Sequence, residues 1–198
     1  MVIKQPVYGL ILAGGFSKRM GQDKALLNYH GKPQVNYVHD LLLPYCENIF
    51  VSLREDQATL PVYQSFKSLI DAPEFKDKGP IGGILTALTS YPNVAWLVLA
   101  CDLPFVTGTT IATLLAKRNP STVATAFRST TNQLPEPLCA IWEAFSLDKV
   151  LSLYQQGIFC PRKALIKLDA HIINQDNPQW LDNVNNHDEY QAALKILN

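Results

Sequence analysis

The sequence predicts an α/β fold built around a mainly parallel β-sheet. The clearest signal is three short apolar runs of strand length, Val7–Leu12, Asn48–Leu53 and Ala95–Ala100. Such runs are typical of parallel strands, because helices cover both of their faces. The chain has 198 residues, 47% of them hydrophobic and 17% charged, which is enough for a sizeable core. Since no repeat or low-complexity linker divides the sequence, we expect a single domain over residues 1–198.

The stretches between these runs are long enough for helical crossovers. Helices are expected over Pro33–Leu43, Asp56–Phe66 and Ile81–Ser90, the last after a Gly-Pro break. Ser68–Asp71 is a shorter strand candidate, and Thr109–Lys117 continues the alternation as a helix. Strands that alternate with helices imply right-handed crossovers and therefore parallel neighbours.

The pattern changes after about residue 119. Thr122–Phe127 and Pro137–Trp142 are predicted strands, joined by the polar loop Arg128–Glu136. Parallel strands need long crossovers, so we expect this close pair to be antiparallel and to lie at the far edge of the sheet. The remaining predicted elements are a helix over Phe145–Gln155, a short strand over Ala170–Ile173 and a closing helix over Asp188–Leu197.

Charge and cysteine content exclude several classes of protein. Lysine plus arginine number 17, as do aspartate plus glutamate, and this zero balance disfavours a nucleic-acid binder. Four scattered cysteines without a C-x-x-C pattern disfavour a zinc site and a disulfide framework. The sequence has no signal-peptide pattern and no run of transmembrane length, so we expect a cytoplasmic protein without membrane contact.

The segment Leu12–Lys24 is the strongest functional signal. It leads from the first apolar run through Gly14 and Gly15 into a basic stretch that contains Arg19 and Lys24. Backbone N–H groups of such a loop can surround phosphates while the cations neutralise their charge. The spacing matches neither a P-loop nor a dinucleotide fingerprint, and the alternative is a plain glycine turn between strand and helix.

Two carboxylates follow predicted strands directly. Asp102 comes after Ala95–Ala100, where it is well placed to hold Mg²⁺ beside a triphosphate, because Mg²⁺ combines one or two carboxylates with phosphate oxygens and water. Asp71 ends another strand and precedes a Gly-Pro helix entrance. The alternatives are a surface aspartate that caps a turn, and glycines at 82 and 83 that serve only close helix–sheet packing.

These motifs together resemble the MobA family of molybdenum cofactor guanylyltransferases, within the nucleotidyltransferase superfamily. The resemblance is carried by L-A-G-G-F-S-K-R-M-G-Q-D-K over residues 12–24, C-D-L-P-F over 101–105, Asp71 followed by G-P-I-G-G, and N-V-N over 183–185. It is dense to about Lys32, intermittent to Phe105 and thin until Asn183. It implies a three-layer α/β/α, Rossmann-like nucleotidyltransferase fold with an antiparallel addition in the second half.

The resemblance also implies roles for individual residues. Arg19, Lys24 and Asp102 would be catalytic, and Asp102 would also bind the metal. Asn183 and Asn185 would lie near a pterin substrate. The residues implied in GTP binding are Leu12, Ala13, Gly14, Gly15, Lys24, Ser52, Asp71 and Asp102.

The implied reaction transfers GMP from GTP to the phosphate of molybdopterin, with Mg²⁺ as cofactor and pyrophosphate as the second product. Transient contact with molybdenum-insertion and molybdoenzyme-maturation proteins is a further expectation. Ser52 departs from the family, in which many members carry asparagine, so the choice of base stays open. Alternatives are CTP with molybdopterin, a nucleotide with a sugar phosphate or cobalamin precursor, and a non-catalytic nucleotide-binding protein. Arg162 and Lys163 either meet a phosphorylated substrate or form a solvated patch.

Overall fold

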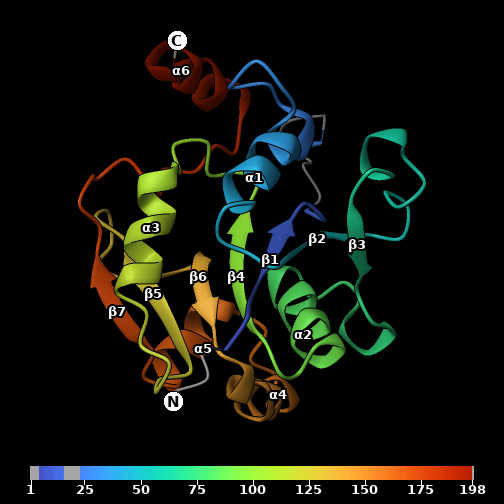
Figure 1. The fold of residues 1–198 in the computed structure, drawn as a ribbon, viewed down its shortest axis with the longest axis vertical. Helices are drawn as coiled ribbons and strands as arrows, with labels where there is room; N and C mark the ends of the chain where they lie inside the picture. Colours follow the sequence, from blue (N-terminus) through green and yellow to red (C-terminus); the bar gives the residue numbers. More distant parts are fainter. Residues whose placement is uncertain (1–4, 16–22, 198) are drawn as a thin grey trace.

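A seven-stranded β-sheet runs through the molecule, with helices on both faces (Figure 1). The computed structural model describes residues 5–15 and 23–197. The strand order is β3-β2-β1-β4-β6-β5-β7. The strands are β1 Val7–Leu12, β2 Asn48–Leu53, β3 Lys67–Ile70, β4 Ala95–Ala100, β5 Ala124–Arg128, β6 Pro135–Trp142 and β7 His171–Asn174.

One strand of the sheet runs against all the others. The strands β1 to β4 are mutually parallel, whereas β6 is antiparallel to both of its neighbours, β4 and β5. The predicted antiparallel pair is therefore confirmed, but its expected place at the far edge is wrong, because β7 lies outside it, parallel to β5. Burial explains this order, since the run Cys139–Trp142 of β6 is fully buried, as an interior strand requires, while β7 is largely half-buried or exposed.

Alternating strand residues feed two cores, one on each face of the sheet. Ile11 and Leu97 face the core that α1 and α3 cover, whereas Leu10 and Trp96 face the core under α2, α4 and α5. This arrangement confirms the three-layer α/β/α architecture. The helices are α1 Gln34–Leu42, α2 Pro80–Ser90, α3 Gly108–Ala116, α4 Leu147–Gln155, α5 Pro161–Lys167 and α6 His187–Leu197.

The closing helix α6 packs on a smaller third cluster beside the sheet. Its Ala193 is buried with Leu27, Tyr29 and Val184. Helix α6 therefore covers the residues that follow the segment Leu12–Lys24, which we call the glycine segment. Among the described residues, no helix has the length and apolar character needed to cross a membrane.

The predicted helix over Asp56–Phe66 is wrong. Residues 55–60 form turns, and only a 3-10 turn at Pro61–Tyr63 follows. The reason is Pro61, since a residue before proline is driven out of the helical region, and Leu60 accordingly has an extended ψ of 133°. The short helix α5 was not predicted from the sequence, and β6 starts two residues earlier than expected.

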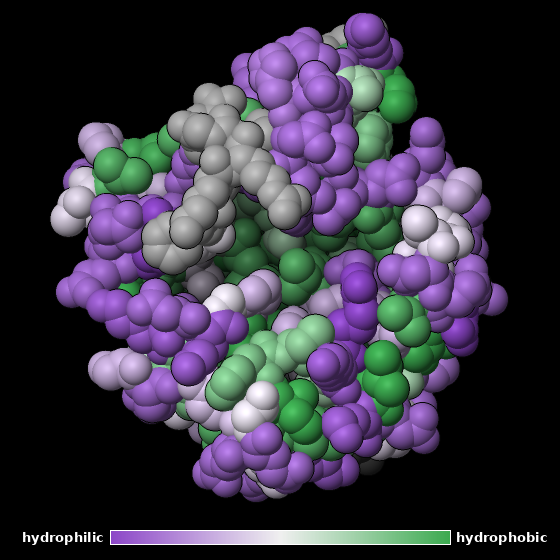
Figure 2. Space-filling view, turned by 180° about the vertical axis from the view of Figure 1, so that it is seen from behind, coloured by the Kyte–Doolittle hydropathy of each residue, from purple (hydrophilic) through white to green (hydrophobic). Residues whose placement is uncertain are grey.

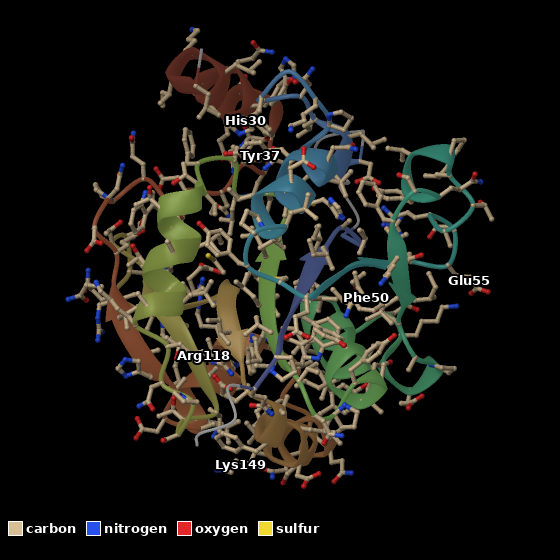
Figure 3. The ribbon with its side chains drawn as sticks, viewed as in Figure 1. His30, Tyr37, Phe50, Glu55, Arg118 and Lys149 are labelled. Atoms are coloured by element: carbon tan, nitrogen blue, oxygen red, sulfur yellow. The ribbon has the colours of Figure 1, made fainter. Side chains whose placement is uncertain are left out.

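A buried ion pair lies far from the carboxyl ends of the parallel strands. Arg118, just after α3, donates from Nε and a terminal nitrogen to the two carboxylate oxygens of Glu143, over 2.7 and 2.6 Å. Figure 3 places Arg118 near one end of α3, away from His30 and Tyr37 at the opposite end of the sheet. We therefore regard this pair as part of the scaffold. Viewed from behind, the surface has a central hollow with an apolar floor and a largely hydrophilic rim (Figure 2).

Candidate functional site

The carboxyl ends of β1, β2 and β4 lie side by side at one end of the strands, and open α/β folds bind their ligands at this end. A pocket of about 290 Å³ and a smaller one of about 150 Å³ open there, and they share Leu12, Gly15 and Pro80. Every residue implied in GTP binding lines one of these two pockets. The larger contains Gly14, Ser52 and Asp71, and the smaller contains Ala13, Lys24 and Asp102.

Three predicted residues that are far apart in the sequence converge at the smaller pocket. The Lys24 ammonium lies 3.5 Å from the Asp102 carboxylate and donates a hydrogen bond of 2.7 Å to the Asn185 side-chain oxygen. The Val184 N–H donates to the Asp102 carbonyl over 2.9 Å, which fixes the chain end against β4. Lys24 therefore stands between the strand-end carboxylate and the C-terminal segment.

Asp102 is held in a setting that favours its neutral form. Burial raises the pKa of its carboxyl above the ordinary value, and the nearby Lys24 ammonium opposes this rise. A carboxylate in such a place gains from every cation that approaches it. A second carboxylate, Glu136 on β6, interacts electrostatically with Asp102, and burial also raises the pKa of Glu136.

Asp71 follows β3 and faces the larger pocket. Burial, with a contribution from Asp77, raises the pKa of Asp71 to about 6, while a hydrogen bond with Ser52 opposes the rise. Helix α2 begins beside Asp71 and lies very close to Ser52 on β2 and to the backbone of Phe75. A Cβ on Gly83 would lie 2.5 Å from Ser52 Oγ, and one on Gly82 would lie 2.5 Å from the Phe75 carbonyl oxygen. Gly83 therefore permits close packing of α2 against β2, and Gly82 permits close packing against the backbone of Phe75.

Arg54 holds the glycine segment from the side. One of its terminal nitrogens donates to the Gly14 and Gly15 carbonyls over 2.9 and 3.1 Å, while the rest of the guanidinium pairs with Asp56. No cis peptide is present among the described residues. In a trans peptide the C=O and the following N–H point in opposite directions. The N–H of Gly15 therefore points away from Arg54, where it is available to an anion.

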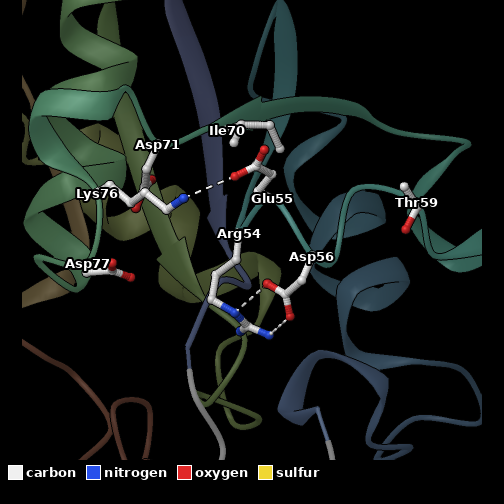
Figure 4. A pocket seen from close by; sticks show the side chains of 8 residues that line it. All are labelled: Arg54, Glu55, Asp56, Thr59, Ile70, Asp71, Lys76 and Asp77. Atoms are coloured by element: carbon white, nitrogen blue, oxygen red, sulfur yellow. Dashed lines mark hydrogen bonds and ion pairs between the residues drawn. The ribbon is translucent and has the colours of Figure 1, made fainter.

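Beyond Asp71 the site continues into a charged pocket of about 450 Å³ (Figure 4). It shares Arg54, Asp71 and Asp77 with the 290 Å³ pocket that Gly14 and Ser52 line. An ion pair of 3.0 Å joins Lys76 to Glu55 across this pocket. Most of the residues that line it are charged, and Ile70 adds an apolar side chain.

A fourth pocket, of about 510 Å³, is lined in part by Val184, whose N–H donates to the Asp102 carbonyl. It is bounded by the β5–β6 turn and by the segment that precedes α6, and it includes Asn183 and Glu136. Arg162, on α5, also lines it, donating to the Pro135 carbonyl and pairing with Glu136 over 3.1 Å. Cys160, just before this helix, is an exposed free thiol.

The structure separates the predicted site residues into two groups and leaves one out. The residues implied in GTP binding line the two adjoining pockets, and Asn185 joins Lys24 there, whereas Asn183 lies in the pocket with Glu136. Arg19 lies outside the described residues. Sequence reasoning missed Arg54 and Glu136, and the only signal available was that Arg54 directly follows a strand end.

The donor set around Asp102 fits a magnesium ion. Within the described ranges, no three acidic, histidine or cysteine side chains gather into a ready-made metal cage. Mg²⁺ does not require one, since it is commonly held by one or two carboxylates together with substrate phosphates and water. Asp102, beside a pocket with a cation and backbone donors, matches that habit.

Most of the chain matches known proteins in sequence. The family described as MobA-like NTP transferase domain matches residues 9–172. A molybdenum cofactor biosynthesis bifunctional protein from Synechocystis sp. is 40% identical over 96% of this chain, which spans only 54% of that relative. A molybdenum cofactor guanylyltransferase from Pseudomonas aeruginosa is 30% identical, with 83% of this chain and 82% of that protein covered.

A solved structure supports the fold independently. The molybdopterin-guanine dinucleotide biosynthesis protein A from Archaeoglobus fulgidus superimposes with a TM-score of 0.78, covering 96% of this chain and 97% of that one. The two sequences are 22% identical, so this likeness concerns the fold alone.

Proposed function

Because the chain belongs to the MobA-like NTP transferase family, we propose that it transfers GMP from GTP to the phosphate of molybdopterin and releases pyrophosphate, in molybdenum cofactor biosynthesis. The observation that carries this proposal is the convergence of Lys24, Asp102 and Asn185 beside the glycine segment. That arrangement offers a cation, a carboxylate and backbone donors at the edge of a parallel sheet, as a nucleoside triphosphate and its metal require.

Charge decides which way the nucleotide lies. The triphosphate belongs near Gly14, Gly15 and Lys24, because backbone N–H groups and an ammonium attract it. The Asp71 carboxylate would repel a phosphate, but it accepts hydrogen bonds from the N–H groups of a base or the hydroxyls of a ribose. The nucleoside therefore lies towards Asp71 and Ser52, and the phosphates lie towards Asp102.

The chemical step is an in-line displacement at the α-phosphorus. An oxygen of the acceptor phosphate forms the new P–O bond, the bond from the α-phosphorus to the bridging oxygen breaks, and pyrophosphate leaves with that electron pair. The nucleophile is already an anion, so no side chain has to remove a proton. Lys24 lowers the barrier by stabilising charge that builds up on the phosphates.

Asn185 and the chain end orient this lysine. The hydrogen bond from Lys24 to Asn185 restricts the ammonium to the side of the pocket that faces Asp102. Mg²⁺, when bound, would be held by Asp102 together with phosphate oxygens and would supply Lewis-acid polarisation of the reacting phosphate.

The acceptor belongs in the 510 Å³ pocket bounded by the β5–β6 turn and α6. Val184 lines this pocket and its N–H donates to the Asp102 carbonyl, so an acceptor there would present its phosphate towards Asp102 and the α-phosphorus. Asn183 and Glu136 offer hydrogen-bonding groups to a heterocycle rich in N–H and C=O groups, as a pterin is.

A nucleotide panel tests the proposal. Pyrophosphate release is measured with GTP, CTP, UTP and ATP, each with and without molybdopterin and with Mg²⁺ present. We expect release that requires both GTP and the acceptor. Preference for CTP would reassign the base, release with a sugar phosphate in place of molybdopterin would reassign the acceptor, and tight GTP binding without turnover would favour a non-catalytic nucleotide-binding protein.

A further inference from the structure

The glycine segment is braced by a stretch of chain that has no part in the proposed chemistry. Residues 54–63 follow β2 and end with the 3-10 turn Pro61–Tyr63. In place of the predicted helix they form turns closed by short backbone hydrogen bonds, among them Gln57 N–H to Arg54 C=O at 3.0 Å and Leu60 N–H to Gln57 C=O at 3.0 Å. At the centre of these turns lies Gln57, a polar side chain that is only 2% exposed.

The Gln57 amide has a protein partner for its oxygen and for each of its two N–H groups. Its oxygen accepts from the Arg54 N–H over 3.1 Å. Its nitrogen donates to the Ala13 carbonyl over 3.2 Å and to Asp23 Oδ2 over 2.6 Å. A buried amide with a separate partner for its oxygen and for each N–H is fixed in one orientation.

The two acceptors of that amide lie near the two ends of the segment Leu12–Lys24, in the parts of it that the structure describes. Ala13 is the residue that leaves β1 and lines the smaller pocket. Asp23 caps the 3-10 turn Lys24–Leu26 by accepting a hydrogen bond from the Ala25 N–H over 3.0 Å. The position of Asp23 therefore fixes the start of this turn, and with it the backbone of Lys24. Tyr63 supports Asp23 from the same stretch, since its hydroxyl donates to Asp23 Oδ2 over 2.7 Å.

Resting on the proposed function, we propose that Gln57 is a positioning residue for nucleotidyl transfer. It ties the Ala13 end of the glycine segment, which meets the nucleotide, to the Asp23 end, which presents Lys24 to Asp102. It touches no substrate and acts only through the spacing of these two ends. Displacements of about 1 Å among groups that stabilise a transition state lower rates on the order of a hundredfold, so the tie has kinetic consequences.

Kinetics of Gln57→Leu and Gln57→Glu test the tie. Leucine preserves the approximate volume and removes all the amide's bonds, whereas glutamate keeps the acceptor for Arg54 and sets a carboxylate against Asp23. We expect kcat/KM for GTP to fall about tenfold or more in Gln57→Leu and further in Gln57→Glu. Circular dichroism at the assay temperature establishes that each variant is folded.

The matched control is Thr125→Val on β5. Thr125 is also fully buried, and its hydroxyl oxygen accepts a hydrogen bond of 2.9 Å from the Asn119 N–H, remote from the pockets described above. Its loss perturbs stability in a similar way, but kcat/KM is expected to stay at the wild-type value. Equal kinetic effects of the Gln57 and Thr125 variants would reduce Gln57 to a structural residue.

A double-mutant cycle supplies a readout that a general loss of stability does not move. Gln57→Leu and Tyr63→Phe both release the same Asp23 oxygen, so their effects on kcat/KM should fall short of the product of the single effects. The pair Gln57→Leu and Thr125→Val should multiply. Multiplicative behaviour of both pairs would overturn the proposal.

Affinity for GTP with Mg²⁺, measured by calorimetry, separates this inference from the function itself. If the wild type binds GTP but does not turn it over with molybdopterin, the proposed function fails. The tie then still predicts about tenfold weaker GTP binding in Gln57→Leu and no change in Thr125→Val. Unchanged affinity and unchanged kcat/KM in a folded Gln57→Leu protein would refute the tie while leaving the function intact, and a wild type that binds no nucleotide would refute both.

Discussion

Among single residues, Lys24 makes the contacts on which the proposed chemistry depends most. It contacts both Asp102 and Asn185, so one ammonium links the glycine segment, the end of β4 and the C-terminal segment. The ammonium stabilises the negative charge that builds up on the leaving pyrophosphate, whereas the carboxylate beside it would repel that charge. Burial raises the pKa of the Asp102 carboxyl, and the Lys24 ammonium opposes part of that rise.

Lys24→Ala should lower kcat with GTP by about a hundredfold or more, because a preorganised charge at the reacting phosphates is removed. Asp102→Ala should abolish transfer, because it removes the one carboxylate found among the described residues that line the smaller pocket. The measurement is steady-state pyrophosphate release. Lys32→Ala is the control, because Lys32 is a surface lysine paired with Asp40, and its removal should leave kcat unchanged. Full turnover by Asp102→Ala would contradict the assignment.

Asp71 should give nucleotide binding a pH dependence. Its pKa of about 6 means that the carboxylate becomes fully ionised only above that pH, so GTP affinity should rise as the pH is raised through 6. Because a phosphate group also titrates near this pH, Asp71→Asn is the control that carries only the phosphate contribution. Identical pH profiles for the two proteins, measured by calorimetry, would argue against contact between Asp71 and the nucleoside.

The same carboxyl should reduce stability at neutral pH. Its pKa is raised on folding from 3.8, so the folded state holds the proton more tightly than the unfolded state, and the free energy of unfolding falls as pH rises from about 4 to about 6. Asp71→Asn should therefore melt at a higher temperature than the wild type at pH 7.5, and this advantage should disappear near pH 3.5. An equal advantage at both values would contradict the assigned pKa shift.

At the scale of elements, the close approach of α2 to the sheet shapes the nucleotide pocket. Gly82 sits against the Phe75 backbone and Gly83 against Ser52, so the helix entrance lies as near to the strand ends as a glycine allows.

Gly82→Ala should destabilise the protein by about 1–3 kcal/mol, because the added methyl meets a backbone oxygen that cannot move aside easily. Urea denaturation followed by circular dichroism measures this change. Gly108→Ala at the start of α3 is the matched control, since its Cβ would find only the Tyr45 hydroxyl at 3.7 Å, an ordinary contact. Helix propensity favours alanine over glycine, so comparable losses in the two variants would show that the contact at Gly82 is not responsible.

At the scale of the whole molecule, local patterns predicted most of the sheet and the edge that carries the site. Apolar runs indicate β1, β2 and β4, and the carboxyl ends of parallel strands necessarily meet, so Asp102 and Gly14 could be brought together from the sequence alone. The interior place of β6 could not, because strand order depends on which faces the helices cover. The turns around Gln57 were hidden for a related reason, since the partners of its amide lie 44 and 34 residues away.

Transfer of the α-phosphate tests the central claim most directly. GTP labelled at the α-phosphorus is incubated with molybdopterin and Mg²⁺, and the label is followed in the wild type and in Asp102→Ala. We predict that the wild type transfers the label to the pterin in proportion to the pyrophosphate released, and that the variant transfers none. Label that stays on free nucleotide in the wild type, or transfer that is undiminished in the variant, would contradict it.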